Sequence, residues 1–566
     1  MSSVTSSANT RSSNTQASQA SSALDYDVVI VGAGFAGLTA VHRMRELGFS
    51  ARLYEAGKDV GGTWYWNRYP GLKVDIESVE YSLSFSYVIE QEWTWSERYP
   101  APDELCRYAN FVADRLDLRR DIQLDSRIDV AEFDERANLW VLQNSQGETV
   151  RSRFVIMATG MLNQPIKPSF KGLDSFQGQQ YHSARWPRDG VDLSGQRVGV
   201  IGTGSSGVQI ISTIASEVGH LHVFQRTPGY CLPLRNHPMP EEYSTRVKAN
   251  YAQWRAAERY NSFGGWVALN YEIGEPVTGS ALDATPEELQ ALFDERWKSG
   301  GLSFYNIYPD VYTDLEANEI LAVYLRGKIR ERIKDPKLAD ILTPKYPVLT
   351  KRLIADTNYY EVYERDNVSL VDLSEHGIDE ITPKGVRVGD TEYEFDALVF
   401  ATGFDALIGS LKAMDVRGRK GITFAEHWED GARTHMGLMS AGFPNLFIIN
   451  AAGSPAPLFA PVILGQEQIE WVGRLMLKLN ERELDCIETT SKAEDHWGGL
   501  CEEAVSATLF PLTESWYVGK NVPGKSRTGL AYFGGMDNYR KFMTEAEVSG
   551  YEKDFVLSAA PLAATG

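Results

Sequence analysis

The sequence has few cysteines, and they lie far apart. Its four cysteines form no Cys-x-x-Cys pair: Cys106, Cys231, Cys486 and Cys501. This spacing excludes a compact zinc cluster and a redox-active dithiol, and it provides no disulfide framework. We therefore expect a reducing compartment, the cytoplasm, and no metal site.

Long apolar runs and positive charge are also scarce. No apolar run reaches the roughly 18 to 20 residues that are needed to cross a bilayer. The chain has 56 Lys and Arg residues against 76 Asp and Glu residues, which gives a net charge of −20. Proteins that bind nucleic acid or anionic membranes carry basic surfaces. We therefore expect neither partner, and we interpret the acidity as a source of solubility.

The first 24 residues differ in composition from the rest. They are mostly Ser, Thr, Ala, Asn and Gln, with one basic residue, Arg11. They lack the apolar centre of a signal peptide and the basic residues of a transit peptide, which favours a disordered tail. The length of 566 residues predicts two to four domains in the remainder.

A dinucleotide-binding pattern opens the folded region. The apolar run 26–31 predicts a buried strand, and helical spacing of apolar residues follows at 38–47. Three glycines between them have the spacing Gly-x-Gly-x-x-Gly: Gly32, Gly34 and Gly37. They permit a tight turn, close approach of a diphosphate and packing of helix on strand. The next strand ends at Glu55, whose carboxylate can accept bonds from a ribose; an N-terminal site of this kind favours FAD.

Residues 61–75 combine two glycines with three large aromatic side chains. This composition indicates an irregular segment packed against a flat ligand, with Thr63 and Trp64 as candidate FAD contacts; a surface loop with an aromatic plug is the alternative. Asp75 ends the segment. It is either a cap for the residues that follow or a buried carboxylate that awaits a cation.

A second dinucleotide pattern follows the strand 196–201. Its loop supplies Gly202, Gly204, Ser205, Ser206 and Gly207. The distance from Gly32 to Glu55 is 23 residues, and 23 residues again separate Gly202 from Gln225. Here, however, a neutral amide is followed by Arg226 and Thr227. An arginine pairs with a 2′-phosphate that a carboxylate would repel, so this site is predicted to take NADP.

Two apolar strands that end in Ala-Thr-Gly, 154–160 and 397–405, predict that the chain crosses twice between domains. Helical patterns at 241–259, 285–298 and 313–334 indicate an insertion in the second domain. We expect an α/β protein with two discontinuous Rossmann-like domains. The predicted division is a tail (1–24), an FAD domain (25–155 and 396–566), a linker with the NADP domain (156–230 and 341–395), and a helical insertion (231–340).

Three further segments are candidates for function. Between the two loops, an aromatic, a glycine, a histidine and a tryptophan occur at fixed offsets: Phe176, Gly178, His182 and Trp186, before Pro187. Lys351 and Arg352 are either a solvated pair, the default for such a dipeptide, or include an inward cation placed where negative charge develops. The segment 516–525 begins at Trp516 and is either a mobile cover or a terminal loop.

Together these motifs resemble the type I Baeyer–Villiger monooxygenases, over nearly all of residues 25–550. The resemblance implies FAD and NADPH as cofactors, a ketone and O2 as substrates, and an ester or lactone formed through a C4a-peroxyflavin and a tetrahedral adduct. We expect a monomer. Arg352 is implied as the stabilising cation, with Asp75 as its partner and a member of the FAD site. Gly202, Gly204, Ser205, Ser206, Gly207, Arg226, Thr227, Lys351 and Trp516 are implied for NADP, and the 176–187 linker for coupling the domains.

Three alternatives remain at this stage. A flavin monooxygenase that oxidises amine nitrogen or sulfide sulfur would share both loops, but Trp186-Pro187 and the Asp75 and Arg352 pair favour ketones. A disulfide reductase needs the missing Cys-x-x-Cys. A non-catalytic nucleotide-binding module would not need two distinct cofactor preferences.

Overall fold

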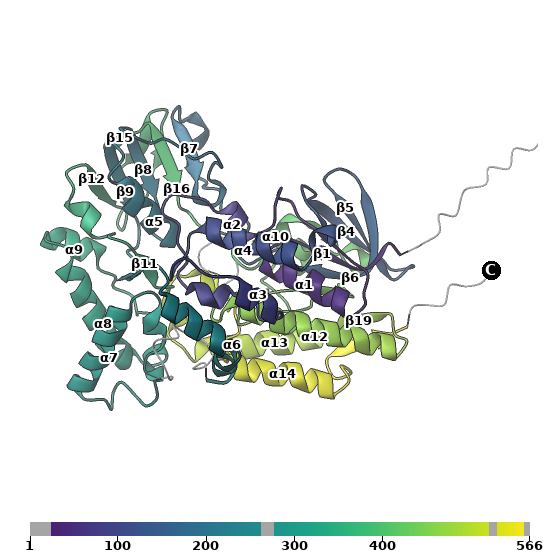
Figure 1. The fold of residues 1–566 in the computed structure, drawn as a ribbon. Coiled ribbons are helices and arrows are strands. Elements are labelled where there is room, and N and C mark those ends of the chain that lie inside the picture. Colours follow the sequence, from purple (N-terminus) through teal and green to yellow (C-terminus); the bar gives the residue numbers. More distant parts are fainter. Residues whose placement is uncertain (1–23, 262–276, 520–528, 560–566) are drawn as a thin grey trace, which may run out of the picture.

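The computed structural model describes residues 24–261, 277–519 and 529–559 (Figure 1). Except for its last residue, the predicted tail 1–24 lies outside the described residues. So does the second half of the 516–525 segment. None of the described helices is both long and apolar enough to cross a membrane.

The first domain is built on an eight-stranded sheet. Its strands are, in spatial order, β17 (Asp415–Arg417), β4 (Ile128–Asp134), β5 (Leu139–Asn144), β6 (Thr149–Met157), β1 (Tyr26–Val31), β2 (Ala51–Tyr54) and β3 (Ile122–Gln123). An eighth strand, β18 (Leu446–Ile448), also pairs with β6. β1 is parallel to β2 and β6, and its residues 28–31 are buried. This is the arrangement expected of an apolar strand covered on both faces.

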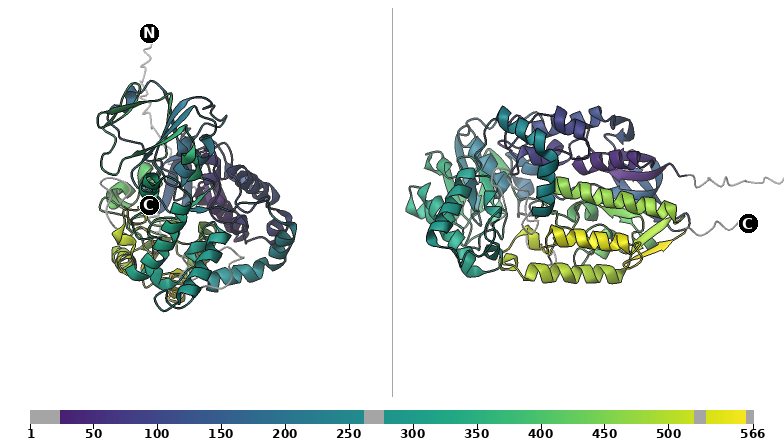
Figure 2. Two further views of the ribbon diagram at one scale, coloured as in Figure 1. Left: turned by 90° about the vertical axis from the view of Figure 1, so that its left-hand side faces the viewer. Right: turned by 60° about the horizontal axis from the view of Figure 1, so that its bottom comes forward.

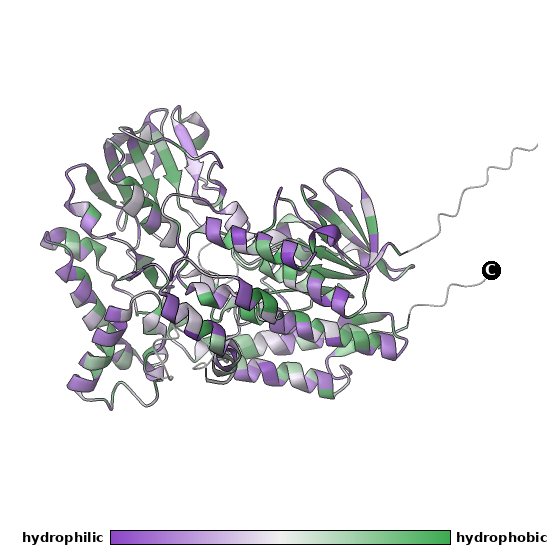
Figure 3. Ribbon diagram, in the orientation of Figure 1, coloured by the Kyte–Doolittle hydropathy of each residue, from purple (hydrophilic) through white to green (hydrophobic). Residues whose placement is uncertain are grey.

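The second domain has a five-stranded sheet that is parallel throughout. Its order is β12 (Val368–Asp372), β9 (His220–Gln225), β8 (Arg197–Ile201), β16 (Ala397–Phe400) and β7 (Gln179–His182). A small antiparallel sheet joins β13 (Glu380–Ile381), β14 (Gly385–Val388) and β15 (Thr391–Glu394). Figure 3 shows hydrophobic residues concentrated on β8 and β16, where the core of this domain lies.

The chain crosses between the sheets twice, after β6 and after β16. The crossings lie side by side, because the Ile166 N–H donates to the Gly403 carbonyl and the Asp405 N–H donates to the Gln164 carbonyl. The predicted boundary at 396 differs from this arrangement. β16 pairs with β7 and β8 of the second sheet, so the return to the first domain begins after Phe400. An apolar strand that ends in Ala-Thr-Gly fits either sheet, and only its pairing decides which one.

The helical insertion is divided between the two domains. α7 (Pro286–Ser299), α8 (Leu315–Glu331) and α9 (Pro336–Leu342) pack on the second domain, whereas α6 (Glu241–Asn261) packs on the first beside α3 (Tyr87–Glu92) (Figure 1). The Tyr243 hydroxyl donates to Glu77, and Arg255 donates to the Ser82 carbonyl. The insertion was predicted within the second domain alone; its first helix instead packs on the first domain.

The remaining helices cover the first sheet and its edges. They are α1 (Phe35–Glu46), α2 (Thr63–Trp66), α4 (Pro102–Arg115), α10 (Gly409–Ala413), α11 (Phe424–His427), α12 (Pro461–Glu481), α13 (Ser491–Ser506) and α14 (Met536–Val548). α12 packs directly on α1, and α13 and α14 lie beyond it (Figure 2). Two short strand pairs complete the fold: β10 (Cys231–Pro233) with β11 (Ile354–Asp356), and β19 (Cys486–Thr489) with β20 (Phe555–Ser558). In the second domain, α5 (Ser205–Ile214) follows β8.

Candidate active site

A cavity of about 1120 Å³ lies where the two domains meet, lined by residues of both. Ten of the residues singled out from the sequence line it: Gly32, Gly34, Glu55, Thr63, Trp64, Asp75, Ser205, Ser206, Arg352 and Trp516. The others lie outside its lining: Gly37, Phe176, Gly178, His182, Trp186, Gly202, Gly204, Gly207, Arg226, Thr227 and Lys351. The structure therefore brings together residues that are up to 484 positions apart in the chain.

The first glycine loop leaves no room for a Cβ at Gly32 or Gly37. Gly32 has a φ of +104°, and a Cβ on it would lie 2.6 Å from the Ala158 carbonyl oxygen. A Cβ on Gly37 would lie 1.8 Å from the Gly32 carbonyl oxygen. Gly34 and Gly62 face each other, since a Cβ on Gly62 would lie 2.7 Å from the Gly34 Cα. The loop therefore presents bare backbone at the start of α1, as a diphosphate requires.

Glu55 is held in place by the loop that it follows. Its carboxylate accepts hydrogen bonds from the backbone N–H groups of Ala33 at 2.6 Å and Gly57 at 2.7 Å. Burial raises the pKa of Glu55, and these two donors oppose that effect. Each carboxylate oxygen has a further lone pair. The group can therefore accept bonds from ribose hydroxyls at the cavity wall.

The second glycine loop repeats the geometry of the first. Gly202 has a φ of +110°, and a Cβ on Gly207 would lie 2.1 Å from the Gly202 carbonyl oxygen. Gly204 has no heavy atom within 4 Å of its Cβ position, and no side chain caps the start of α5. The first N–H groups of this helix have no capping side chain, and uncapped N–H groups at a helix N-terminus suit an anion.

Lys351 and Arg226 form a positively charged region beside the second loop. The Lys351 amino group lies 4.9 Å from the centre of the Tyr346 ring. Burial lowers the pKa of Lys351, and the nearby charge of Arg226 lowers it further. A phosphate between the two cations would relieve this repulsion.

Asp75 and Arg352 form a two-point ion pair. Arg352 Nε donates to one carboxylate oxygen of Asp75 at 2.7 Å, and Nη2 donates to the other at 3.0 Å. Burial disfavours the charge of Arg352, but Asp75 outweighs it and holds the pKa of the guanidinium well above its usual value. About a quarter of each side chain is accessible, 24% for Arg352 and 25% for Asp75. Arg352 is thus a permanently charged and oriented guanidinium that lines the cavity together with its counter-ion.

Two buried tyrosines beside Arg352, Tyr305 and Tyr517, were not identified from the sequence. The Tyr517 hydroxyl hydrogen-bonds with the Arg352 guanidinium and with Tyr305. The Tyr305 hydroxyl also accepts the backbone N–H of Leu353 at 3.2 Å. Trp516 stacks on Tyr517 with ring centres 4.2 Å apart. No local pattern marks either tyrosine; only the proximity of Tyr517 to Trp516 in the chain was a signal.

The 176–187 linker lies beside the cavity, in the second domain and along the crossings. Phe176 and Trp186 are buried in the second domain, and a Cβ on Gly178 would lie 2.6 Å from the Asp396 carbonyl oxygen. His182 Nδ1 accepts the N–H of Ala184 at 3.1 Å. Its Nε2 therefore carries the proton, and it lies 3.2 Å from both the Ile166 carbonyl oxygen and the Thr402 hydroxyl.

The residues that line the cavity, together with those beside it, fit both expected cofactors. The glycine cradle and Glu55 suit the diphosphate and ribose of FAD. The Asn450 side-chain oxygen, which lines the same cavity, is buried without a hydrogen-bond partner among the described residues; such an atom needs a donor from a ligand. The open start of α5, with Lys351 and Arg226, suits NADP.

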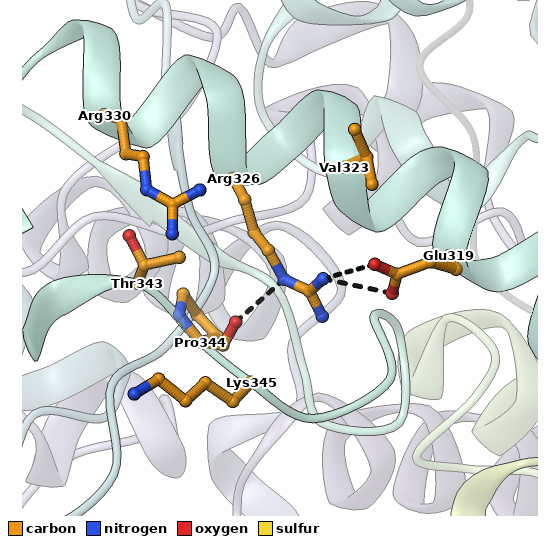
Figure 4. Close-up of a pocket in the computed structure, with 7 residues that line it drawn as sticks. All are labelled: Glu319, Val323, Arg326, Arg330, Thr343, Pro344 and Lys345. Carbon is orange, nitrogen blue, oxygen red and sulfur yellow. Dashed lines mark hydrogen bonds and ion pairs between the residues drawn. The ribbon is translucent and has the colours of Figure 1, made fainter. Parts of the chain in front are cut away.

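A second, shallow hollow of about 330 Å³ lies between α8 and the loop after α9 (Figure 4). Arg326 donates to both carboxylate oxygens of Glu319 there. Arg330 and Lys345 lie 4.0 Å and 3.6 Å from Asp340. Because its cations have acidic partners and no predicted site residue lines it, we assign the chemistry to the larger cavity.

Comparison with known proteins agrees with this geometry. Residues 29–241 match the family model described as pyridine nucleotide-disulphide oxidoreductase. A Baeyer–Villiger monooxygenase of Pseudooceanicola batsensis is 41% identical, over 93% of this chain and 95% of that protein. Phenazine N-monooxygenase of Lysobacter antibioticus is 39% identical, over 95% of this chain and 98% of that protein.

Solved structures give the same result. An oxidised steroid monooxygenase bound to NADP superposes with a TM-score of 0.87 and 43% identity, over 94% of this chain and 99% of that one. OTEMO in complex with FAD and NADP superposes with a TM-score of 0.88 and 36% identity, over 94% and 100%. The two glycine loops, the cavity between them and these relatives together show that the chain belongs to the flavin-dependent Baeyer–Villiger monooxygenases, which use FAD and NADP.

Proposed function

We propose that this enzyme converts aliphatic ketones, linear or cyclic, to esters or lactones, with Arg352 as its catalytic cation. The observation that carries the proposal is the Arg352–Asp75 pair, fixed at 2.7 Å and 3.0 Å in the cavity between the two nucleotide loops. The overall reaction consumes one ketone, one O2, one NADPH and one proton. It yields one ester, one NADP+ and one water. Bound FAD supplies the chemistry that takes the hydride of NADPH and activates O2.

Arg352 acts on the charge that develops during oxygen insertion. Attack on a ketone carbonyl carbon leaves negative charge on the carbonyl oxygen. A guanidinium already oriented in a water-poor cavity stabilises this charge without reorganising. Asp75 is a positioning residue: its two hydrogen bonds fix the plane of Arg352, and Tyr517 also interacts with the guanidinium.

The substrate class is supported by the apolar wall beside the pair. The loop Ala456–Phe459 lines the cavity together with Ile76, Tyr81 and Val462. Among these, Ala456, Leu458 and Phe459 are no more than 5% exposed. A wall of this kind favours apolar ketones and excludes water from the reacting carbonyl.

The second loop is assigned to NADPH. Ser205 and Ser206 begin α5 and line the cavity, where their backbone N–H groups can hold the diphosphate. Arg226, Thr227 and Lys351 are assigned to the 2′-phosphate, and Trp516, which lines the cavity, is assigned to NADP. Thr63 and Trp64 are assigned to FAD.

We further propose that the protein acts as a monomer in the cytoplasm. The four cysteines are all unpaired, which agrees with a reducing compartment. Light scattering during gel filtration tests the monomer, which a mass of two chains or more would exclude.

The second candidate function is oxidation of amine nitrogen or sulfide sulfur. It is supported by the similarity to phenazine N-monooxygenase. Such a reaction places no anionic carbonyl oxygen next to Arg352, so the ion pair favours ketones.

Anaerobic reduction tests the proposal. The purified protein is reduced with NADPH without oxygen, and O2 is then admitted together with linear and cyclic aliphatic ketones, an amine and a sulfide. We expect flavin bleaching, then an ester or lactone identified by mass spectrometry. In Arg352→Ala, NADPH is still expected to bleach the flavin. The rate of ester formation is expected to fall by about 100-fold or more, because a preorganised charge has been removed.

The matched control is Arg417→Ala, which removes a surface arginine paired with Asp415. It should keep full activity. Full ester yield from Arg352→Ala would remove this residue from its role. Oxidation of the amine or sulfide without any ester would favour the second function.

A further inference from the structure

One segment of the first domain, residues 69–75, is inserted against the nucleotide helix of the second. We call it the strap. Tyr69 and Leu72 are buried in the hydrophobic core of the second domain, although they belong in sequence to the first. The strap ends at Asp75, the partner of Arg352. The strap therefore connects α5, whose first residues are predicted to bind NADP, with the proposed reaction centre.

Tyr69 contacts the start of α5. Its hydroxyl donates to the side-chain oxygen of Gln209 at 3.0 Å, and it also interacts with the hydroxyl of Ser206. Ser206 is in the first turn of α5 and lines the cavity. The position of the Tyr69 ring thus depends on that first turn.

Gln209 joins the strap at a second point. Its amide nitrogen donates to the Lys73 carbonyl at 3.0 Å, while its oxygen accepts from Tyr69. One side chain of α5 therefore holds the strap at two positions, 69 and 73. The second is only two residues before Asp75.

Gly71 shows how closely the strap approaches the helix. Its φ is +75°, and a Cβ on it would lie 1.9 Å from the Thr213 hydroxyl oxygen and 2.7 Å from the Gln209 carbonyl oxygen. Packing this tight transmits displacement instead of absorbing it, because side chains have no free volume to occupy. A shift of α5 must therefore move the strap.

We propose that the strap is the mechanical link by which nucleotide binding at α5 sets the Asp75–Arg352 pair, with Tyr69 and Gln209 as its positioning residues. The inference rests on the proposed function, since it takes this pair as the reaction centre. NADP+ at the start of α5 favours the position of Ser206 and Gln209 in which Tyr69 and Lys73 are held. Asp75 is then placed to orient Arg352. By reciprocity, loosening the pair weakens NADP+ binding.

Hydrogen exchange measured by mass spectrometry tests the strap without catalysis. In the FAD-loaded wild type, NADP+ is expected to slow exchange in two peptides, residues 202–208 and residues 69–76. In the double variant Tyr69→Phe/Gln209→Leu, NADP+ should still protect 202–208, because the loop itself is intact. Protection of 69–76 should be lost.

The second measurement is NADP+ affinity, determined by isothermal titration calorimetry for a double-mutant cycle. Asp75→Asn is expected to lower NADP+ affinity about fivefold or more in the otherwise intact chain, the lower end of typical coupling between sites. In the Tyr69→Phe/Gln209→Leu background the same change should have less than about a twofold effect. A purely structural role for the strap would leave the two effects equal.

Tyr363→Phe is the control variant, because it also removes one buried tyrosine hydroxyl in the second domain, where it bonds to Tyr359 at 2.9 Å. It should leave both readouts unchanged. The proposed role of the strap is wrong if NADP+ still protects residues 69–76 in the double variant. It is also wrong if Asp75→Asn changes NADP+ affinity equally in both backgrounds. A wild type that makes no ester but shows paired protection would instead overturn the proposed function and leave the strap standing.

Discussion

Gly32 and Gly202 have nearly the same left-handed conformation, with φ of +104° and +110°, and each is followed five residues later by a glycine packed on its carbonyl. Glu55, which directly follows β2, and Gln225, the last residue of β9, each lie 23 residues after the first glycine of their loop. Yet Glu55 turns into its own loop to accept two backbone N–H groups, whereas Gln225 donates away from the loop to the Ile341 carbonyl. The two loops thus share their backbone geometry, and the two sites differ in the side chain that lies 23 residues after the first glycine.

The surroundings of the loops differ as well. In the first loop, a Cβ on Gly34 would lie in ordinary contact with the Gly62 Cα, at 3.6 Å, whereas in the second loop a Cβ on Gly204 would have no heavy atom within 4 Å.

Substitution of the last glycine in either loop is expected to have the largest effect on cofactor binding. Gly37→Ala and Gly207→Ala each place a Cβ about 2 Å from a carbonyl oxygen of the same loop. Gly37→Ala should yield protein without FAD. Gly207→Ala should keep its yellow colour and lose NADP+ affinity by about 100-fold or more, equivalent to roughly 2.7 kcal/mol. Flavin absorbance and NADP+ titration measure the two outcomes.

Gly204→Ala provides the contrast within the second loop, since its Cβ meets open space. It should fold and keep FAD. Colourless Gly207→Ala protein would show that the two loops do not act separately.

Removal of a positive charge beside the second loop is expected to have the next largest effect, on the KM for NADPH. Arg226→Ala or Lys351→Ala should each raise the KM for NADPH about 10- to 100-fold, because a charge-assisted bond contributes about 1.5–3 kcal/mol. The KM for NADH should not change. An equal rise for both nucleotides would place these side chains away from the 2′-phosphate.

Glu55→Gln tests the first site with little change in volume. The amide nitrogen cannot accept the backbone N–H that the carboxylate accepts from Ala33 or Gly57. We expect FAD affinity to fall about tenfold, in line with one charge-assisted hydrogen bond, while NADP+ affinity stays within about twofold. Reconstitution of the apoprotein with FAD, followed by fluorescence, measures the first quantity.

Acid is expected to lower the stability of the second domain, and this effect should be smaller than those above. Burial, and then the nearby His220, lower the pKa of His222 on β9 to about 4, below the usual 6.5. The unfolded state therefore takes up this proton before the folded state does, so stability falls as pH drops from 6.5 towards 4. The matching strand of the first domain, β2, has no histidine.

Thermal unfolding between pH 7 and pH 5 measures this effect. His222→Gln should flatten the pH dependence relative to the wild type, and the exposed His376→Gln should not. An unchanged slope in His222→Gln would assign the acid sensitivity to other groups.

Features encoded over short stretches of sequence were predictable. The two loops follow from the spacing of their glycines, and the helices of the insertion and the strands β1, β8 and β9 follow from local apolar spacing. The contact of Asp75 with Arg352 joins residues 277 positions apart, and only the resemblance to a family implied it. Tyr69, Tyr305 and Tyr517 were missed, because a lone tyrosine carries no pattern until the fold places its hydroxyl.

Packing partners were also beyond the sequence. The spacing in α6 shows that one face is buried, but not that this face meets the first domain. The apolar strand β16 fits either sheet by composition, and the boundary at 396 was therefore placed one strand too early.

The double crossing of the chain has a consequence for synthesis on the ribosome. All five strands of the second sheet have been made once residue 400 is complete, whereas β18, which pairs with the central strand β6, ends at Ile448. The domain that starts later in the sequence can thus close first. Strands β1 to β6 must wait, with an open sheet edge, until nearly 300 more residues have emerged. Because growing chains usually fold from the N-terminus onward, the opening third of this chain is where a nascent-chain chaperone has most to protect.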